Sequence, residues 1–479
     1  MAVGVLVGVI TGVTLLCPAV GGARETAGVD PLIEAGAFAE AETLLRRQIT
    51  DAGAPVVDGP ARRLEILRRT RRDFSLDVES LKRVLRRALP DVSDEDLVRW
   101  TASGALQHRV IDGEVRYFRK APRNVFLLSD EARERRDARR TSTRRGFDLD
   151  DTLARIVALC EETDEPLLAP IKHTARYRLR VKPGHPRVRT GAVVRAWLPF
   201  PQELPQQTDV RLISSTPAAK RIAPSGTPHR TVYFEQTLGD DGAAPTFEIE
   251  LEFTTFSQYA KLDPERVEPY DTGGELYTRY TAERLPHIAF TPEARQLAAE
   301  IIGDETNPQE KARRVFHWVS ANIPWVGEME YGIIPSLSQK GIEARCGDCG
   351  VQGLVFVTLC RLAGVPARWQ SGWELQPGRW NLHDWSEIYL EPWGWVPVDA
   401  SYGVRDSDDP RVADFFLGHM DPYRWIINLD YARELDPPKT SFRSEPNDFQ
   451  RGEVEIDGHN LYFDDWTYRA EFTSERLGW

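Results

Sequence analysis

The stretch that decides the fold is Arg345-Cys346-Gly347-Asp348-Cys349-Gly350-Val351-Gln352, which runs on through Gly353-Leu354-Val355-Phe356-Val357-Thr358-Leu359-Cys360-Arg361. A turn that contains Gly and Asp leads into an apolar run, which ends at Gly364-Val365-Pro366. We therefore expect a buried helix with Cys349 in its first turn. The free N–H groups and the positive end of the helix dipole favour a thiolate there, although a cysteine in an apolar run is often only a core residue.

Two short strands follow this helix. Residues 383–390 have strand character, and a turn with Pro and Gly separates them from a second strand at residues 395–399. In one register of the resulting hairpin Asp399 lies directly opposite His383, which suits a carboxylate that holds an imidazole. A turn centred on Pro392 and Trp393 instead places Asp399 opposite Ser386, about 10 Å from His383.

A cysteine at a helix start with a His and an Asp on neighbouring strands provides the groups needed for thiol acyl transfer. Cys349, the helix end Gly364-Val365-Pro366-Ala367-Arg368, the strand His383-x-Trp385-x-Glu387 and the strand Gly394-Trp395-Val396-Pro397-Val398-Asp399 occur in this order. Together these four motifs, within about residues 300 to 403, resemble the core of the transglutaminase-like superfamily.

The resemblance implies a papain-like fold and a Cys-His-Asp triad. Carried over by position, the nucleophile is Cys349, the base is His383 and the orienting acid is Asp399. The backbone N–H of Cys349 is the natural first oxyanion donor, and Trp325 and Tyr331, from the preceding segment, are candidates for a side-chain donor. Trp385 is a further candidate for the cleft.

Other roles for these residues remain open. Cys346 and Cys349 also have the spacing of a dithiol redox pair or of half a zinc site, but no second ligand pair and no βαβ context is readable nearby. A reversible Cys346–Cys349 disulfide that silences the nucleophile is a subsidiary hypothesis. His317 and His419 are rivals of His383 as the base. We predict neither a metal site nor a cofactor.

Length and charge limit the class of protein. A chain of 479 residues is too long for one compact core, so two to four domains are expected. The formal net charge of −12 argues against nucleic acid as a general partner. The basic runs of the N-terminal half mix with acidic residues and are typical of a solvated helix face.

The first residues resemble a secretory signal. Residues 3–16 are apolar, and small residues up to Ala23 make residues 1–23 a removable signal peptide, although a positive start is missing. The run is short for a membrane span, so we predict a secreted or periplasmic protein without stable membrane insertion. Lipidation of Cys17 is an alternative, which Leu16 disfavours. The four cysteines after the signal do not form a disulfide framework.

Changes of pattern divide the remaining chain. Residues 30–160 have helical spacing, with hairpin chemistry at Asp112-Gly113, and predict a small, mostly helical domain. Residues 166–260 alternate as strands do and predict a β-sandwich of immunoglobulin-like build, with five readable runs. These runs are residues 175–181, 192–200, 210–214, 231–234 and 247–253.

Residues 275–405 hold the predicted transglutaminase-like core, in which helices beginning at Thr291-Pro292 and Asn307-Pro308 pack on the helix of Cys349. Residues 406–479 are rich in aromatics and are expected to pack on that core. The predicted fold class is therefore α+β: a helix bundle on an antiparallel sheet, preceded by a sandwich and a helical domain.

These expectations lead to one functional hypothesis and two alternatives. The first is hydrolysis of an amide in a protein or peptide through a thioester on Cys349. Transfer to a lysine amine is an alternative, although no calcium loop of the D-x-[DN]-x-[DN]-G type is present. The other alternative is a secreted binding module that keeps the fold without catalysis. The oligomeric state is not readable from the sequence.

Overall fold

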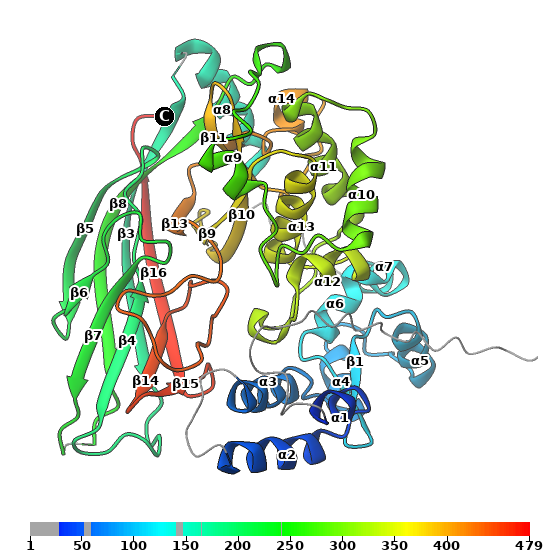
Figure 1. The fold of residues 1–479 in the computed structure, drawn as a ribbon, viewed down its shortest axis with the longest axis vertical. Coiled ribbons are helices and arrows are strands. Elements are labelled where there is room, and N and C mark those ends of the chain that lie inside the picture. Colours follow the sequence, from blue (N-terminus) through cyan, green and yellow to red (C-terminus); the bar gives the residue numbers. More distant parts are fainter. Residues whose placement is uncertain (1–27, 52–58, 140–146, 164, 241) are drawn as a thin grey trace, which may run out of the picture.

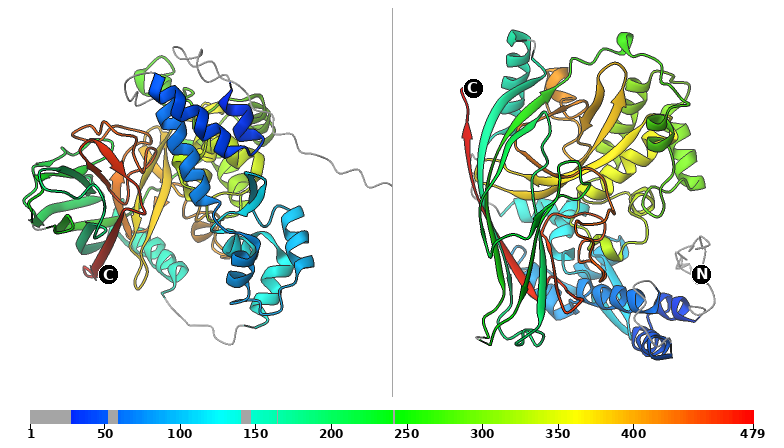
Figure 2. Two further views of the ribbon diagram at one scale, coloured as in Figure 1. Left: turned by 90° about the horizontal axis from the view of Figure 1, so that it is seen from below. Right: turned by 60° about the vertical axis from the view of Figure 1, so that its left-hand side comes forward.

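The computed structural model describes residues 28–51, 59–139, 147–163, 165–240 and 242–479, and the predicted signal peptide and Cys17 lie outside these ranges. Long strands form a layered β structure, and a helix-rich part with a smaller sheet lies beside it (Figure 1). The N-terminal helices lie at one end of the molecule (Figures 1 and 2). Within the described ranges, no helix combines the length and apolarity needed to cross a membrane.

Residues 29–163 are mostly helical. The helices are α1 (Val29–Glu34), α2 (Phe38–Asp51), α3 (Pro60–Asp73), α4 (Val78–Leu85), α5 (Asp94–Ala102), α6 (Ala121–Leu128), α7 (Asp130–Asp137) and α8 (Leu149–Thr163). Strands β1 (His108–Ile111) and β2 (Glu114–Tyr117) form a hairpin. Asp112 and Gly113 join them with φ of 51° and 81°, the left-handed geometry of a type I′ turn. The Asp-Gly pair in the sequence therefore predicted the hairpin because both turn positions require a positive φ.

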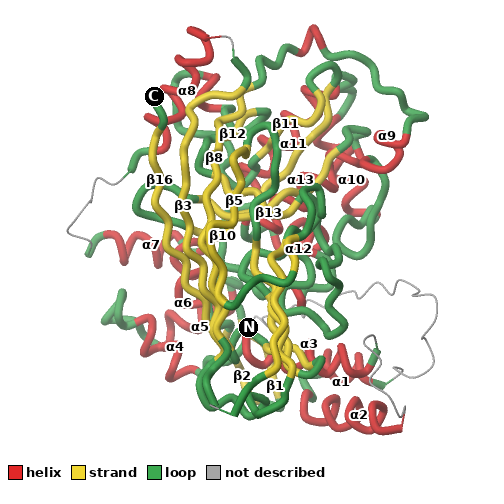
Figure 3. Tube along the Cα trace, turned by 90° about the vertical axis from the view of Figure 1, so that its left-hand side faces the viewer, coloured by secondary structure: helices red, strands yellow, loops and turns green. Residues whose placement is uncertain are grey.

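Two five-stranded sheets pack face to face and share one apolar core. The long strands of one sheet run side by side in Figure 3. The strands from the first half are β3 (Leu167–Val181), β4 (Val193–Pro199), β5 (Gln207–Thr216), β6 (Arg221–Ile222), β7 (Thr231–Thr237) and β8 (Thr246–Tyr259). Each of the five predicted runs lies largely within one of these strands. Along β3 buried and more exposed residues alternate, because successive side chains point to opposite faces.

The segment after residue 405 packs on the core only in part: Phe415, Phe416 and Tyr431 join its apolar cluster, as predicted, but the later strands do not. It contains α14 (Pro410–Ala413), β12 (His419–Met420), β13 (Arg424–Asn428), β14 (Glu453–Ile456), β15 (His459–Leu461) and β16 (Trp466–Arg476). Only β13 joins the sheet of the core, whereas β12, β14, β15 and β16 belong to the sandwich sheets. β16 pairs with β3 along its whole length. The tail therefore completes the sandwich, since its strands cover free edges of β3, β4 and β8.

The remaining elements form the predicted helix layer and antiparallel sheet. The helices are α9 (Glu275–Tyr280), α10 (Pro292–Ile302), α11 (Pro308–Asn322), α12 (Leu337–Ala344) and α13 (Cys349–Leu362). The strands are β9 (Ala367–Glu374), β10 (Asn381–Leu390) and β11 (Gly394–Val398), and the sheet order is β11-β10-β9-β13. Thr291 and Asn307 cap α10 and α11 as expected. Residues Cys349 to Arg361 are all buried, as expected for a helix that is apolar on every side.

The hairpin of β10 and β11 adopts neither predicted register. Leu390 pairs with Gly394 and Ser386 pairs with Val398, so that Asp399, one residue beyond β11, falls opposite Trp385. His383 lies two residues from Trp385 and therefore on the same face, where a diagonal neighbour is within reach. The contact between His383 and Asp399 arises in this diagonal way and not by direct pairing.

Candidate functional site

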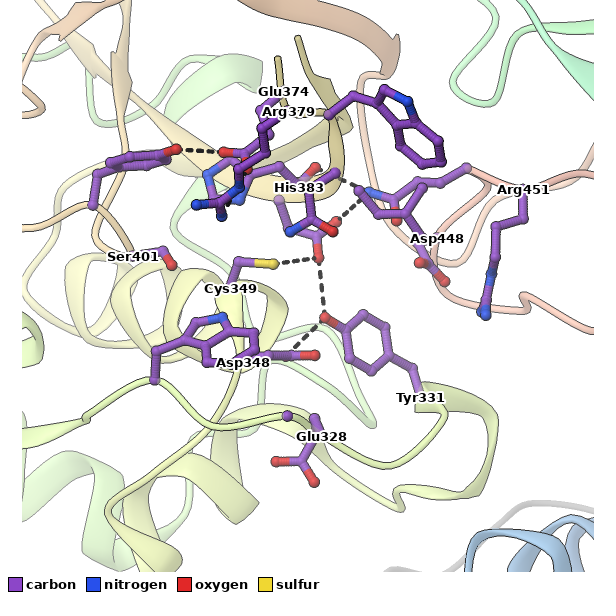
Figure 4. A pocket seen from close by; sticks show the side chains of 18 of the residues that line it. Glu328, Tyr331, Asp348, Cys349, Glu374, Arg379, His383, Ser401, Asp448 and Arg451 are labelled. Atoms are coloured by element: carbon purple, nitrogen blue, oxygen red, sulfur yellow. Dashed lines mark hydrogen bonds and ion pairs between the residues drawn. The ribbon is translucent and has the colours of Figure 1, made fainter. Parts of the chain in front are cut away.

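A polar cleft of about 960 Å³ lies where the start of α13 meets the edge of the core sheet. Both Cys349 and His383 line it (Figure 4). Its walls also include Lys120 and Arg123 from the N-terminal helices and Asp448 and Arg451 from the tail. Four parts of the chain therefore build one cleft, which the sequence pattern of the core alone did not show.

Cys349 occupies the first position of α13, as predicted. The preceding residue, Asp348, is the N-cap, and its carboxylate accepts a hydrogen bond from the N–H of Val351. Cys349 is 8% exposed, so the thiol reaches the cleft from a largely buried position. The next residue must be glycine, because a Cβ on Gly350 would lie 2.1 Å from the Tyr331 hydroxyl.

The thiol of Cys349 donates its hydrogen bond to Asp384 Oδ2, at 3.3 Å. Burial and the carboxylates of Asp384 and Asp348 raise the pKa of this thiol well above its usual value. The prediction that the helix start favours a thiolate is therefore wrong for this arrangement. The cap carboxylate already neutralises the helix terminus, and the second carboxylate repels a negative sulfur.

Behind the cleft, His383 Nε2 lies 2.7 Å from Asp399 Oδ2. Arg424 donates to the same oxygen at 2.9 Å and to Asp421 at 2.6 Å. Burial opposes the charge of His383, but Asp399 outweighs it and raises the pKa of the imidazole. Burial likewise opposes the ionisation of Asp399, but His383 and Arg424 lower its pKa to about 2. An ionised Asp399 thus holds the ring from one side.

Cys349 and His383 share the cleft without a direct hydrogen bond between them in the described part of the chain. Helix α13 packs on the face of β10 that carries Asp384 and Ser386, whose hydroxyl donates to the Gly353 carbonyl. His383 leaves the strand on the opposite face, where its ring stacks near Trp385, with the centroids 5.9 Å apart. Strand alternation therefore gives the sulfur Asp384 as its partner.

Tyr331 does not have a free hydroxyl for an oxyanion. Its oxygen accepts from the N–H of Gly350 at 3.1 Å and lies 2.8 Å from Asp348 and 3.0 Å from Asp384. A phenol has a single proton, so it can donate to only one of these two carboxyls at a time. Burial raises the pKa of Asp348 to about 7 and that of Asp384 to about 6.

The two tryptophan candidates have different surroundings. Trp325 lines the cleft beside Gly347, and among described residues none accepts a hydrogen bond from its indole N–H. Trp385 is 1% exposed and donates to Gln370, so it supports His383 from behind and does not reach the cleft. Its prediction as a cleft residue was wrong, because it lies in the layer between His383 and Arg424.

The rival residues do not line the cleft. His317, on α11, lies 2.9 Å from Asp414. His419 stacks on Tyr259, and burial lowers the pKa of its imidazole to about 3. Cys346 is a free thiol of intermediate exposure. Within the described residues, no three His, Cys, Asp or Glu side chains are placed to hold a metal ion.

Sequence reasoning missed the carboxyls around the sulfur. Asp348 was readable as an N-cap, and Asp384 directly follows His383, but their common position beside Cys349 depends on the packing of α13 on β10. Asp448 belongs to the tail, nearly a hundred residues after Cys349, and no local pattern connects the two.

A comparison with protein families identifies the part of the chain that contains this site. Residues 295–400 match the model described as the transglutaminase-like superfamily. This segment is a transglutaminase-like core. It contains Cys349, His383 and Asp399 and excludes the sandwich and the N-terminal helices, which the family model does not cover.

Two curated relatives share part of the chain. An uncharacterized protein of Haemophilus influenzae is 27% identical over 229 residues, which are 40% of this chain and 61% of that protein. The uncharacterized protein YebA of Bacillus subtilis is 26% identical over 209 residues, 37% of this chain and 28% of YebA. The chain thus spans less than two thirds of either relative.

Two solved structures are similar to parts of the chain. A candidate cysteine protease from Cytophaga hutchinsonii is 14% identical with a TM-score of 0.42, and the match covers 64% of this chain and 91% of that one. The periplasmic domain of TgpA from Pseudomonas aeruginosa is 16% identical with a TM-score of 0.23, over 51% of this chain and 91% of that one. At such TM-scores, neither likeness establishes an activity for the transglutaminase-like core described here.

Proposed function

We propose that this protein is a cysteine-dependent enzyme that hydrolyses amide bonds in proteins or peptides. The observation that carries the proposal is that Cys349, at the start of α13, and His383, held by Asp399, line the same cleft within a transglutaminase-like core. These are the nucleophile, the base and the orienting acid of a thiol acyl-transfer site.

In this scheme the thiol proton leaves its hydrogen bond to Asp384 and passes to the neutral His383 imidazole. The sulfur then attacks the amide carbonyl carbon, and the C–N bond breaks as the imidazolium gives its proton to the leaving amine. Water, deprotonated by His383, breaks the resulting thioester and releases a carboxylic acid. The Cys349 backbone N–H and the Trp325 indole N–H, which lines the cleft, stabilise the oxyanion.

The place of action belongs to the same proposal. The apolar start of the chain supports export to the periplasm or the exterior, where the substrate is a protein or peptide. Transfer of the acyl group to an amine instead of water is the alternative within the same chemistry.

A non-catalytic binding role is the second candidate, and one observation favours it. The sulfur is hydrogen-bonded to Asp384, its pKa is raised by burial and carboxylates, and His383 leaves β10 on the other face. A thiol in this state is a weak nucleophile until its proton moves.

Incubation with a peptide library, with and without a fluorescent amine, tests the three readings. We expect new peptide termini from the native protein, and about a thousandfold loss or more in Cys349→Ala and His383→Ala. Asp399→Asn should lose less, since it misorients the ring without removing it. His317→Ala, a histidine outside the cleft, is the matched control and should keep full activity.

The outcomes separate the candidates. Labelled glutamines in place of new termini would indicate transfer to amines. If neither product forms, while the same peptides bind equally to native protein and Cys349→Ala, the enzyme proposal is wrong and the binding role stands.

A further inference from the structure

The carboxyl group of Asp448 has no use in the proposed reaction. Asp448 is 6% exposed and lines the cleft of Cys349, on the tail segment that precedes β14. No other residue in the described ranges donates a hydrogen bond to this carboxyl, and none forms an ion pair with it. Within those ranges its own backbone N–H is the only donor that bonds it, and no cation pairs with it directly, so its position points to a cationic group that arrives from the cleft.

Neighbouring groups make an unpaired negative charge on Asp448 still less favourable. Burial, Glu445 and Asp384 raise the pKa of Asp448 well above its usual value. The cation nearest in the tail, Arg451, is already bound to Glu330 and Glu445. Figure 4 shows Asp448 between Arg451 and the residues around the sulfur, on the side of the cleft where Tyr331 lies.

Other acidic residues of the cleft are already compensated. Asp150 forms a two-oxygen ion pair with Arg405, at 2.7 and 3.1 Å. Glu374 accepts a hydrogen bond from the Tyr402 hydroxyl and pairs with Arg379 at 3.2 Å. Asp384 and Asp348, beside the sulfur, accept hydrogen bonds but, like Asp448, form no ion pair with a cation among the described residues.

We propose that Asp448, together with Asp384, binds a primary ammonium group of the peptide whose amide is cleaved. This inference rests on the proposed function and adds to it the class of substrate. The ammonium is a compact cation with three donors, which suits two carboxyl groups that line the same polar cleft.

The ammonium belongs to the acyl donor and not to an attacking amine. An amine must lose its proton before it can attack a thioester, and carboxylates beside it stabilise the protonated form. A cation held at Asp448 is thus a recognition element, which places the substrate carbonyl near Cys349. It is either the free amino terminus or a lysine side chain close to the cleaved bond.

Calorimetry on full-length Cys349→Ala tests this without any turnover. Three peptides are titrated: Ala-Ala-Ala amide, its N-acetylated form, and N-acetyl-Ala-Lys-Ala amide. We expect at least one ammonium peptide to bind about ten-fold or more tighter than the neutral peptide. Tighter binding of Ala-Ala-Ala amide would identify the amino terminus as the recognised group. Tighter binding of N-acetyl-Ala-Lys-Ala amide would identify the lysine side chain.

Two further variants in the same background test the role of the residue. Asp448→Asn should reduce the preference for the ammonium to less than about three-fold, and Asp448→Glu should retain most of it. Asp148→Asn is the matched control, since Asp148 also lines the cleft and an asparagine keeps its bonds to the N–H groups of residues 150 and 151.

Equal binding of charged and neutral peptides, or an unchanged preference in folded Asp448→Asn, overturns the inference. Circular dichroism identifies any variant that has not folded, and in that case Asp448→Glu alone decides: loss of the preference would count against the proposal and retention would support it. Cys349→Ala reports binding without turnover. The binding result therefore stands whether or not the native protein hydrolyses peptides.

Discussion

At Cys349 two electrostatic effects act in opposite directions. A helix N-terminus carries roughly half a positive charge and favours a thiolate. Burial and the carboxylates of Asp384 and Asp348 favour the thiol, and their combined effect raises its pKa. The second set of effects wins because burial, the largest of them, disfavours a charge on the sulfur, and Asp384 lies at hydrogen-bond distance from it. The resting protein therefore favours a protonated thiol at Cys349.

This balance predicts the pH dependence of alkylation. The rate of carbamidomethylation of Cys349 should rise with pH through the alkaline range, because only the thiolate reacts and the pKa of this thiol is raised well above its ordinary value. Asp384→Asn removes a negative neighbour, so the thiol pKa should fall and the rate at pH 7.5 should rise about three- to ten-fold. Peptide mass spectrometry between pH 6 and 10 measures both profiles.

Asp148→Asn, which removes a cleft carboxylate that does not affect the thiol pKa, should leave the profile unchanged. A native protein that reacts rapidly at pH 6 would show that the thiolate is already formed. An unchanged profile in Asp384→Asn would show that Asp384 does not raise the pKa of the Cys349 thiol.

Among the elements, α13 is positioned by close contact with α12. A Cβ on Gly341 of α12 would lie 2.6 Å from Val355 Cγ2 and 2.7 Å from Val351 Cγ1. Both contacts are to branched side chains with little freedom to move, and both valines are buried. The glycine therefore allows the two helices to approach, and this approach sets the position of the helix that carries Cys349.

Gly341→Ala should destabilise the protein. The gain in helix propensity is about 1 kcal/mol, whereas two contacts this short place overpacking in the upper part of its usual range, about 2–3 kcal/mol, so we expect a net loss of about 1–2 kcal/mol in unfolding free energy. Urea denaturation followed by circular dichroism measures it. Gly239→Ala, where no atom lies within 4 Å of the new Cβ, is the control. A neutral or stabilising Gly341→Ala would contradict the close-packing account.

At the scale of the whole molecule, the N-terminal helices hold one wall of the cleft. Asn124 of α6 donates to the Gly327 carbonyl at 2.7 Å and accepts from its N–H at 2.9 Å. Lys120 donates to the Glu328 carbonyl at 2.8 Å, and Arg119 pairs with Glu330 at 2.7 Å. The segment that carries Trp325 and Tyr331 is therefore tied to a part of the chain outside the transglutaminase-like core.

Asn124→Ala should loosen this wall. It leaves a buried N–H and a buried carbonyl of Gly327 without partners, which should cost about 1–3 kcal/mol and speed amide hydrogen exchange in residues 326–331. The proposed cleavage of peptides should fall as Trp325 and Tyr331 lose their positions. Asn322→Ala, whose side chain makes one exposed bond at the end of α11, is the control.

If exchange in residues 326–331 stays as in the native protein, the N-terminal helices do not hold the wall. Faster exchange that spreads over the whole chain would instead indicate global destabilisation and would also contradict a local role.

The tail shows the same dependence on the complete chain. Its aromatic residues suggested a layer on the core, which Phe415, Phe416 and Tyr431 form, but β16 lies along β3 and β14 along β4. Pairing between strands nearly three hundred residues apart leaves no local signal, because alternation shows that a segment is a strand and not which edge it joins. Asp448 reaches the cleft only through this route.

The sequence by itself determined the elements and the order of the chemical groups. Apolar runs, caps such as Asn307 and turns such as Asp112-Gly113 act over a few residues, so the helices, most strands and the positions of Cys349, His383 and Asp399 could be predicted. Only the tertiary structure decided which group meets which. The register of β10 and β11, the face of β10 on which α13 packs and the return of the tail depend on contacts between distant segments. Those contacts gave the sulfur Asp384 as its partner and raised its pKa.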